Sequence, residues 1–402
     1  MINVIGQGYI GLPTALMFAQ SGQEVVGTDL DKKKIEKLQG GHTTFSEKGM
    51  DDLFDEAVQK GIRFSTDYQE ADCYIISVPT PYDEKNKRVD PTYVIEATKA
   101  CLDICKKGAI IIIESTVSPG TLHKYIRPIF EEKGFQLGQD VHLVHAPERI
   151  LPGNMIHELR HNSRTIGAES PEIGDQVKKL YQSFCQGEIV VTDIKTAEMS
   201  KVVENTFRDI NIAFANELAK ICREDGMDVY EIIRIANMHP RVNILQPGPG
   251  VGGHCISVDP WFLVGDYPDL TQLVGTARQV NDSMPIYVLH RIHEIMAENG
   301  LDDLSQVGIY GLSYKENVDD TRNSPTLQLL NYLVGARVYD PYIEKDLVAN
   351  QDHSFEAFLD KVKLVVVMLS HDHLKERMED LEGKLILDTK NIFPQGEGIY
   401  KL

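Results

Sequence analysis

This sequence has fewer cationic than anionic residues, and it also lacks several patterns that would mark other classes of protein. Lys and Arg number 41 against 60 Asp and Glu, so the formal net charge is -19. Such a charge disfavours nonspecific attraction to nucleic acid or to an anionic membrane surface. The six cysteines lack metal-ligand spacing, and a chain of this length does not need disulfides. We therefore expect no metal site and a reducing compartment.

Long apolar runs are also absent. No window approaches the roughly 18 uninterrupted apolar residues of a membrane-spanning helix. The N-terminus enters an apolar run without a preceding basic segment, so no signal peptide is predicted. We expect a cytoplasmic protein that binds neither membrane nor nucleic acid.

Short apolar runs alternate with longer mixed segments over the first 190 or so residues. Each run is continuously apolar, as in strands of a parallel sheet that helices cover on both faces. A long stretch with helical spacing, without Gly or Pro, follows from Thr196 to at least Arg223. The alternation resumes after about Asp302. The predicted strands lie at residues 2–5, 24–28, 74–78, 109–113, 141–144, 307–310, 336–339, 364–368 and 385–387.

This order predicts an α/β protein with three domains. They are an N-terminal Rossmann-like dinucleotide domain at 1–194, a central helical domain with a long helix at 195–298, and a smaller C-terminal Rossmann-like domain at 299–402. Two nucleotide-sized α/β domains joined by a helical spacer favour an active site in the cleft between them.

A dinucleotide fingerprint follows the first predicted strand. Gly6-Gln7-Gly8-Tyr9-Ile10-Gly11 has GxGxxG spacing and opens a predicted helix over 12–21. Its glycines suit a tight turn, close approach of a pyrophosphate and close helix packing. Asp29 ends the next predicted strand, where a carboxylate binds the ribose hydroxyls and repels a 2′-phosphate. The pattern predicts NAD rather than NADP. Lys34 is a candidate beside the adenosine, although a solvated position is the more common role of a single lysine in such a run.

Thr80 and Thr116 each lie just after a predicted strand. Open α/β sheets hold ligands at the carboxyl ends of their strands, so both threonines are candidate cofactor residues. Ordinary turn or capping roles remain the alternative for each.

Cys255 ends a loop dense in glycine, Gly248-Pro249-Gly250-Val251-Gly252-Gly253-His254-Cys255. Glycines let the backbone lie against a ligand and expose the thiol, whereas a structural cysteine normally sits in an apolar run. On the long predicted helix, Lys201, Asn205 and Arg208 share one face. That face favours an anion or oxyanion site, with a solvated stripe as the alternative. These residues alone indicate an NAD-linked oxidoreductase with a candidate cysteine nucleophile.

Five motifs occur together in one order. They are Gly6 to Gly11, Ala146-Pro147-Glu148-Arg149, Lys201 to Asn205, the loop ending in Cys255, and Gly311 to Arg322. In this combination the chain resembles the UDP-glucose/GDP-mannose dehydrogenase family over essentially its whole length. The runs 204–209 and 239–255 are most similar to members that act on UDP-N-acetyl-D-mannosamine.

The resemblance implies a four-electron oxidation of the sugar C6 alcohol with two NAD in succession. It assigns Cys255 as the nucleophile that forms a thiohemiacetal and then a thioester. Lys201 and Asp259 handle the hydroxyl proton, and Lys201 and Asn205 stabilise oxyanions. Glu148 positions or activates the hydrolytic water, and Thr116 joins this catalytic group.

The resemblance also implies the binding residues and the partners. Arg322 is expected to reach NAD, and Arg241 to reach the substrate from a second subunit of a homodimer or higher homo-oligomer. The expected substrate residues are Arg149, Ile150, Lys201, Asn205, Arg208, His239, Arg241, Gly253, Tyr314 and Lys315.

Arg208 and the run 239–246 differ from the glucose-type pattern and favour a UDP-N-acetylhexosamine. UDP-N-acetyl-D-mannosamine is the expected substrate, with UDP-N-acetylglucosamine or UDP-glucose as the alternatives. Two other classes stay open: a 6-phosphogluconate-type or hydroxy-acid dehydrogenase, which would use no thiol, and a UDP-sugar-binding regulatory protein without catalysis.

Overall fold

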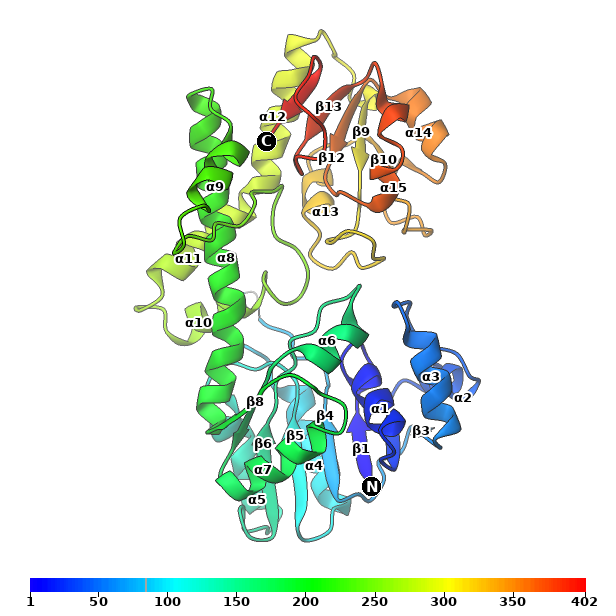
Figure 1. Ribbon diagram of the computed structural model, residues 1–402, viewed down its shortest axis with the longest axis vertical. Helices are drawn as coiled ribbons and strands as arrows, with labels where there is room; N and C mark the ends of the chain where they lie inside the picture. Colours follow the sequence, from blue (N-terminus) through cyan, green and yellow to red (C-terminus); the bar gives the residue numbers. More distant parts are fainter. Residues whose placement is uncertain (84) are drawn as a thin grey trace. The chain divides into compact units, whose positions relative to one another are not determined.

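A computed structural model describes residues 1–83 and 85–402. The chain divides into two compact units, Met1–Val203 and Glu204–Leu402. Each unit holds one open sheet with helices on both faces (Figure 1). The predicted fold class, two Rossmann-like α/β domains with a long central helix, is confirmed. The predicted boundaries at 194 and 298 stay a prediction.

The first sheet has eight strands in the order β3-β2-β1-β4-β5-β6-β7-β8. Its first six strands follow the 3-2-1-4-5-6 order of dinucleotide-binding sheets. Four of them, β1, β2, β4 and β5, are buried over nearly their whole length, which agrees with their continuously apolar sequences. The strands are β1 (Ile2–Ile5), β2 (Val25–Thr28), β3 (Arg63–Ser65), β4 (Cys73–Ile76), β5 (Ala109–Ile113), β6 (Val141–His145), β7 (Arg164–Ala168) and β8 (Ile189–Thr192).

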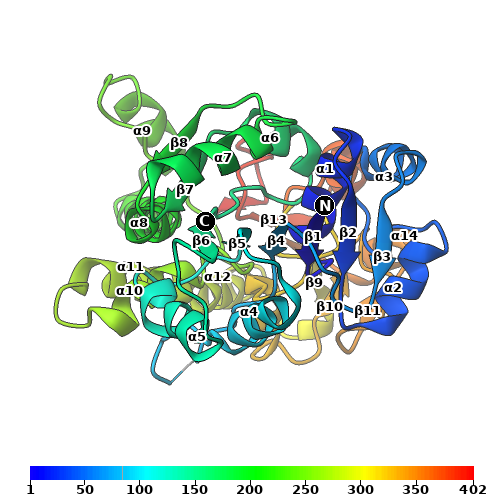
Figure 2. The same cartoon turned by 90° about the horizontal axis from the view of Figure 1, so that it is seen from below.

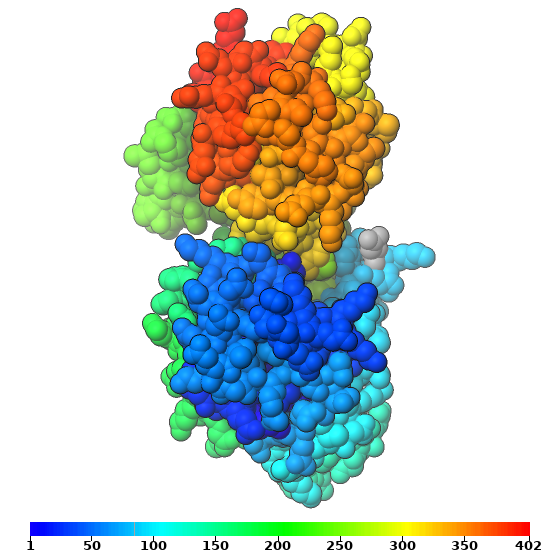
Figure 3. Space-filling view, turned by 90° about the vertical axis from the view of Figure 1, so that its right-hand side faces the viewer, coloured from blue at the N-terminus to red at the C-terminus, as the bar shows by residue number. Residues whose placement is uncertain are grey.

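Helices cover the two faces of this sheet (Figure 2). One apolar core packs α1 (Gly11–Gln20), α3 (Met50–Gln59), α6 (Met155–His161) and α7 (Pro171–Tyr181) on one face. The other core packs α4 (Thr92–Ile104), the π-helical turn Leu122–Ile126 and α5 (Arg127–Glu132). Helices α2 (Lys32–Gln39) and α3 lie on the side of this unit that faces the viewer in Figure 3.

The far edge of the first sheet departs from the expected parallel pattern. Strand β7 runs antiparallel to β6, pairing His145 with Gly167, and β8 then runs parallel to β7. Neither β7 nor β8 was predicted, nor was β3. The sequences of β3 and β7 mix polar residues with apolar ones, whereas β8 is an apolar run that was overlooked in the sequence. The antiparallel step brings the first residue of β7, Arg164, to the carboxyl end of the parallel strands, where ligands bind in such sheets.

The long predicted helix is α8 (Ile194–Glu224), two residues longer at its start than the spacing indicated. Four shorter helices follow it. They are α9 (Val229–Ala236), α10 (Asp259–Asp266), α11 (Gln272–Asp282) and α12 (Met284–Glu298), and the last packs against the second sheet. Among the described residues, no helix combines the length and apolar character needed to cross a membrane.

The second sheet has six parallel strands in the order β11-β10-β9-β12-β13-β14. Helices α12 and α13 (Pro325–Leu330) cover one face, and α14 (Phe355–Lys361) and α15 (Asp372–Lys375) the other. The short strands β11 and β14 were not predicted. The strands are β9 (Val307–Tyr310), β10 (Arg337–Tyr339), β11 (Gln351–Asp352), β12 (Leu364–Val367), β13 (Leu385–Asp388) and β14 (Ile399–Lys401).

The two sheets share one strand order, 3-2-1-4-5-6, and also one local design at the end of the first strand. Gly6 and Gly311 both have positive φ, 90° and 98°. The next backbone N–H donates to an aspartate that ends the neighbouring strand: Gln7 to Asp29 at 2.8 Å, and Leu312 to Asp340 at 2.6 Å. This repeat of geometry is not visible in the sequence, because the two domains share few residues.

Candidate functional site

Packing against neighbouring atoms requires glycine at two positions of the GxGxxG turn. A Cβ on Gly6 would lie 2.6 Å from the carbonyl oxygen of Ser77, and one on Gly11 would lie 1.8 Å from that of Gly6. At Gly8 a Cβ would meet nothing within 4 Å. Gly6 and Gly11 therefore serve the fold of the turn, whereas the open side at Gly8 leaves room for a pyrophosphate.

Asp29 lies at the end of β2 beside this turn. It accepts the Gln7 N–H at 2.8 Å and pairs with Lys34 at 2.6 Å. Burial raises the pKa of the Asp29 carboxyl, but bonds from Lys34 and from the Asp31 and Gln7 amides outweigh it, so the pKa falls below 3.8. An ionised carboxylate here fits ribose hydroxyls and repels a 2′-phosphate, and the site residues thus fit NAD.

The turns that carry Thr80 and Thr116 contact each other. The Thr80 hydroxyl donates to the Thr116 carbonyl at 2.8 Å. The next turn of chain is held by Glu198 of α8, which accepts the N–H groups of Gly120 at 2.5 Å and Leu122 at 2.9 Å. Burial raises the pKa of Glu198 to about 7, against the lowering effect of these bonds. The two threonines predicted at the ends of neighbouring strands, Thr80 and Thr116, are therefore connected by a hydrogen bond.

Glu148 follows β6 and is buried. One of its carboxylate oxygens accepts the Arg149 N–H at 2.6 Å, and the other pairs with Arg164. The Arg149 guanidinium bonds the backbone of Ser163 at 3.0 Å. Ile150 lies in the core of the first unit.

Sequence reasoning missed two charged residues beside Glu148. Arg164 is buried, lies 4.6 Å over the Tyr181 ring, and has one nitrogen 3.8 Å from Glu114. Burial first, and then the charge of Glu148, raise the pKa of Glu114 above its usual range. A carboxylate directly after the apolar run 109–113 was the available signal.

The Gly-rich loop before Cys255 packs against the loop after β9. A Cβ on Gly252 or on Gly253 would lie 2.7 Å from Tyr314. The Gly253 N–H donates to the Arg322 carbonyl at 2.9 Å, and Asn323 donates to the Gly253 carbonyl at 3.0 Å. The structure therefore places the predicted residues Gly253, Tyr314 and Arg322 together, with Cys255 partly exposed two residues on.

Asp259 and Asn205 form a buried pair beside Cys255. The Asn205 amide donates to Asp259 at 2.6 Å, and the Asp259 N–H donates to the Cys255 carbonyl at 2.8 Å. Asp259 begins α10, where the helix dipole favours a negative charge. Lys201, also buried, precedes Asn205 by one turn of α8.

Three asparagines hold the segment that leads into the Gly-rich loop. Asn211 accepts the Leu245 N–H at 2.8 Å, Asn237 accepts the Ile244 N–H at 2.7 Å, and Asn216 accepts the Gly248 N–H at 2.9 Å. The segment is therefore tied to α8 and to the residue after α9. None of the three was singled out from the sequence, because isolated amides on a helix carry no local signal.

Asn216 belongs to a buried polar network. It donates to Asn281 at 2.9 Å, and Asn281 donates to Asp209 at 2.7 Å. Asp209 also pairs with the buried Arg278 at 2.6 Å. Through Asn216, this network holds the start of the Gly-rich loop at Gly248.

The remaining predicted residues differ in exposure. Arg208 is partly buried on α8, and His239 and Arg241 are exposed. Lys315 lies partly buried after β9, and the Arg322 guanidinium bonds the Asp320 carboxylate at 2.8 Å. In the part of the chain that the structure describes, no group of three or more His, Cys, Asp or Glu is placed to hold a metal ion.

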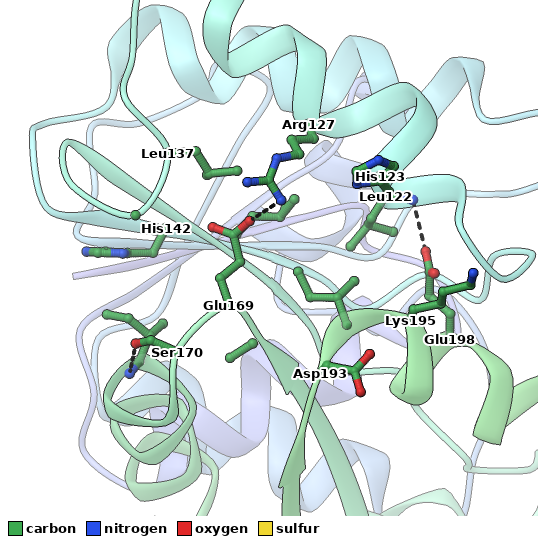
Figure 4. A pocket seen from close by; sticks show the side chains of 15 residues that line it. Leu122, His123, Arg127, Leu137, His142, Glu169, Ser170, Asp193, Lys195 and Glu198 are labelled. Atoms are coloured by element: carbon green, nitrogen blue, oxygen red, sulfur yellow. Dashed lines mark hydrogen bonds and ion pairs between the residues drawn. The ribbon is translucent and has the colours of Figure 1, made fainter.

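A cavity of about 540 Å³ lies in the first unit (Figure 4), and no predicted site residue lines it. Arg127 and Glu169 form an ion pair of 2.8 Å in its wall, and Glu198 lies at its border. Its wall mixes both signs of charge, and its chemistry does not point to a nucleotide.

Three family models match the chain in sequence order. They describe the NAD binding domain of the UDP-glucose/GDP-mannose dehydrogenase family at residues 1–185, its central domain at 195–283 and its UDP binding domain at 308–395.

Individual relatives match over nearly the full length. A UDP-N-acetyl-D-mannosamine dehydrogenase of Methanococcus vannielii is 41% identical over 97% of this chain and 92% of its own. An NDP-N-acetyl-D-galactosaminuronic acid dehydrogenase of Ralstonia nicotianae is 39% identical over 98% and 96%. The solved UDP-N-acetyl-mannosamine dehydrogenase of Staphylococcus aureus is 40% identical, with a TM-score of 0.89 over 100% of this chain and 97% of that one.

Proposed function

Because the chain belongs to the UDP-glucose/GDP-mannose dehydrogenase family and is an NAD-dependent oxidoreductase, we propose that it oxidises the C6 alcohol of UDP-N-acetyl-D-mannosamine to a carboxylate. The arrangement of Cys255 on the Asn205–Asp259 pair carries this proposal. The backbone of the partly exposed Cys255 is bonded to Asp259, whose buried carboxylate accepts a hydrogen bond from the Asn205 amide, and a thiol, a carboxylate and an amide donor suit covalent oxidation of an aldehyde.

In the first oxidation the C6 hydroxyl loses its proton and the carbon loses a hydride. Lys201 and Asp259 take the proton, directly or through water. Bound NAD accepts one hydride in each of the two oxidations. The Gly6–Gly11 turn, Asp29, Lys34, Thr80, Thr116 and Arg322 would hold NAD.

The Cys255 thiolate then adds to the aldehyde carbon, forming a C–S bond and an oxyanion. Lys201 and the Asn205 amide stabilise that oxyanion, because fixed donors in a dry site act most where negative charge develops. Loss of the second hydride leaves a thioester on Cys255. Water positioned by Glu148 adds to the acyl carbon and the C–S bond breaks, which releases the carboxylate and the thiol.

The UDP part is assigned to cationic and small residues from several motifs. Lys315 and Tyr314 follow β9 at the carboxyl end of a parallel sheet, the position where such sheets bind phosphate groups. The other residues assigned to the substrate are Arg149, Ile150, Arg208, His239, Arg241 and Gly253.

The mannosamine configuration is supported by relatives rather than by contacts. Relatives named for UDP-N-acetyl-D-mannosamine and for NDP-N-acetyl-D-galactosaminuronic acid match at almost the same identity, 41% and 39%. Both names specify an N-acetylated hexose, which agrees with Arg208 in place of the glucose-type residue. Epimers differ in binding by only about 1–3 kcal/mol in such pockets, so the sugar must be tested directly.

We expect two NADH for each UDP-N-acetyl-D-mannosamine consumed, because both oxidations occur at one site. The measurement incubates purified protein with NAD and UDP-N-acetyl-D-mannosamine, UDP-N-acetylglucosamine or UDP-glucose, and counts NADH by absorbance and acid product by chromatography. A ratio near one would contradict the thioester mechanism. A higher kcat/KM for UDP-glucose or UDP-N-acetylglucosamine would contradict only the assigned sugar.

We also propose that the chain acts as a cytoplasmic homodimer built on α8. Phe207, Phe214 and Ile221 are 62%, 49% and 54% exposed. They recur every seven residues on one helix, which forms an apolar stripe of the kind that pairs helices. A second copy covering it would also bring Arg241 to the neighbouring substrate site.

Replacing Phe214 with Asp should weaken the dimer by about 100-fold or more, because a carboxylate would be buried in an apolar contact. Sedimentation equilibrium of the wild type and the variant measures this directly. Val334→Asp serves as a matched control, since Val334 is 82% exposed but lies outside α8. An unchanged dimer in F214D would contradict the assigned interface.

A further inference from the structure

Two carboxylates and one guanidinium are buried together in the first unit. Glu114, Glu148 and Arg164 have side chains at most 4% exposed. Arg164 pairs with one oxygen of Glu148, and its other terminal nitrogen lies 3.8 Å from Glu114. The charges do not balance if both acids are ionised, because one cation faces two anions.

Glu114 has the partners that let it carry a proton. Ser77 donates to it at 2.6 Å and Tyr181 at 3.2 Å. Hydroxyl groups can rotate to accept as well as donate, so they tolerate either protonation state of the acid. Burial and the charge of Glu148 both raise the pKa of Glu114. If Glu114 is protonated, the positive charge of Arg164 is balanced by the ionised Glu148 alone.

Glu148 is held at both of its oxygens. The Arg149 N–H binds one at 2.6 Å and Arg164 binds the other. The Arg164 guanidinium lies over the rings of Tyr181 at 4.6 Å and Phe184 at 5.5 Å, and this packing restricts its side chain. The direction in which the carboxylate faces is therefore set by Arg164.

Resting on the proposed function, we propose that Arg164 is the positioning residue that orients Glu148 for thioester hydrolysis, with Glu114 on the other side of the guanidinium. In that step water loses a proton to Glu148, its oxygen bonds the acyl carbon, and the bond to the Cys255 sulfur breaks. The oxidations that precede it do not need Glu148. Arg164 should therefore affect hydrolysis and spare the earlier steps.

The cluster of Glu114, Glu148 and Arg164 is also connected to the dinucleotide turn. Thr14 of α1 donates to Glu114 at 3.4 Å, and the backbone of Ser77 lies against Gly6. Glu114 thus links the cofactor helix to the hydrolytic carboxylate through one arginine. This link requires the antiparallel strand β7, because β7 begins at Arg164.

The test measures where the reaction stops in Arg164→Lys and Arg164→Met. We expect turnover to fall by about 10²-fold or more in R164M, and less in R164K, which retains a cation. In both, the covalent acyl-enzyme on Cys255 should accumulate, seen as an added mass on the intact protein after a quench. The single-turnover yield of two NADH and the kcat/KM for the sugar should change little, whereas KM should fall together with kcat because the acyl-enzyme accumulates.

Three comparisons separate positioning from a merely structural role. Glu148→Gln should trap the same acyl-enzyme, and R164M added to E148Q should slow hydrolysis no further, because Arg164 acts through Glu148. E148Q with R164M also removes both charges, which guards against failure to fold. Arg291→Lys changes another buried arginine, in the second unit, and should leave no acyl-enzyme.

The outcomes separate this inference from the proposed function. If E148Q accumulates acyl-enzyme and folded R164K and R164M do not, or if R164M slows hydrolysis further in E148Q, the positioning role is wrong and the proposed function stands. If E148Q accumulates none while the wild type still makes two NADH per sugar, the Glu148 assignment and this inference both fail. If the wild type oxidises none of the UDP-sugars, the proposed function itself fails.

Discussion

Replacing Cys255 with alanine should abolish formation of the acid product, with a loss in turnover of about 10³-fold or more, as for removal of other covalent nucleophiles. The aldehyde formed in the first oxidation would have no thiol to add to, and the second hydride could leave only from a hydrate. NADH production should therefore stop near one equivalent per site. Quenched single-turnover absorbance and chromatography of the sugar product measure both quantities.

A second cysteine gives a matched control for this variant. Cys105 is partly exposed, as Cys255 is, but belongs to the first unit after α4. Cys105→Ala should keep both the rate and the ratio of two NADH. Acid formation by C255A at a tenth of the wild-type rate or more would contradict the thioester mechanism.

Replacing Asp209 with alanine should cost about 3 kcal/mol of unfolding free energy, because the buried Arg278 guanidinium then keeps only Asp282, whose side chain is half exposed. Asp209 is 0% and Arg278 1% exposed. Asn281 would also lose an acceptor, and through Asn216 the loop at Gly248 would lose its anchor. Activity should fall with stability. Urea unfolding followed by circular dichroism measures the free energy.

The control for this stability change is an exposed ion pair. Glu231 bonds Arg234 at 2.7 Å, and their side chains are 50% and 62% exposed, so Glu231→Ala should cost no more than about 1 kcal/mol. Burial raises the pKa of Asp209 despite Arg278, which indicates that the pair is expensive to bury. The double variant D209L with R278M should therefore regain much of the loss, and a further loss in the double variant would contradict this account.

Most of the fold could be predicted because its cause is local. Buried parallel strands are continuously apolar, and α8 shows helical spacing for 31 residues without Gly or Pro. Strands β3, β7, β11 and β14 were missed because their side chains are polar or of mixed polarity, whereas β8 is an apolar run that was overlooked. The direction of β7 could not be predicted, since pairing depends on contacts far along the chain rather than on periodicity.

The residues of the candidate site also divide into those with a local sequence signature and those without one. Residues with a local signature, such as the GxGxxG turn and Cys255 after its glycines, could be named from the sequence. Glu114 directly follows a predicted strand and could have been named, but its pairing with Arg164 could not, because 50 residues separate the two and Arg164 stands in no motif. Asn205 was named from its place on the long predicted helix and Asp259 through resemblance, but their hydrogen bond is known only from the structure.

By itself the sequence determined the alternation of elements, the glycines at turns and the family to which the chain belongs. These depend on backbone dihedral freedom and on the spacing of apolar residues, which are properties of neighbours in the chain. Only the tertiary structure decided why Gly252 and Gly253 must be glycine, since Tyr314 fills the space a Cβ would need. It also decided that Arg164 pairs with Glu148, because burial makes the charges of residues far apart in the sequence depend on one another.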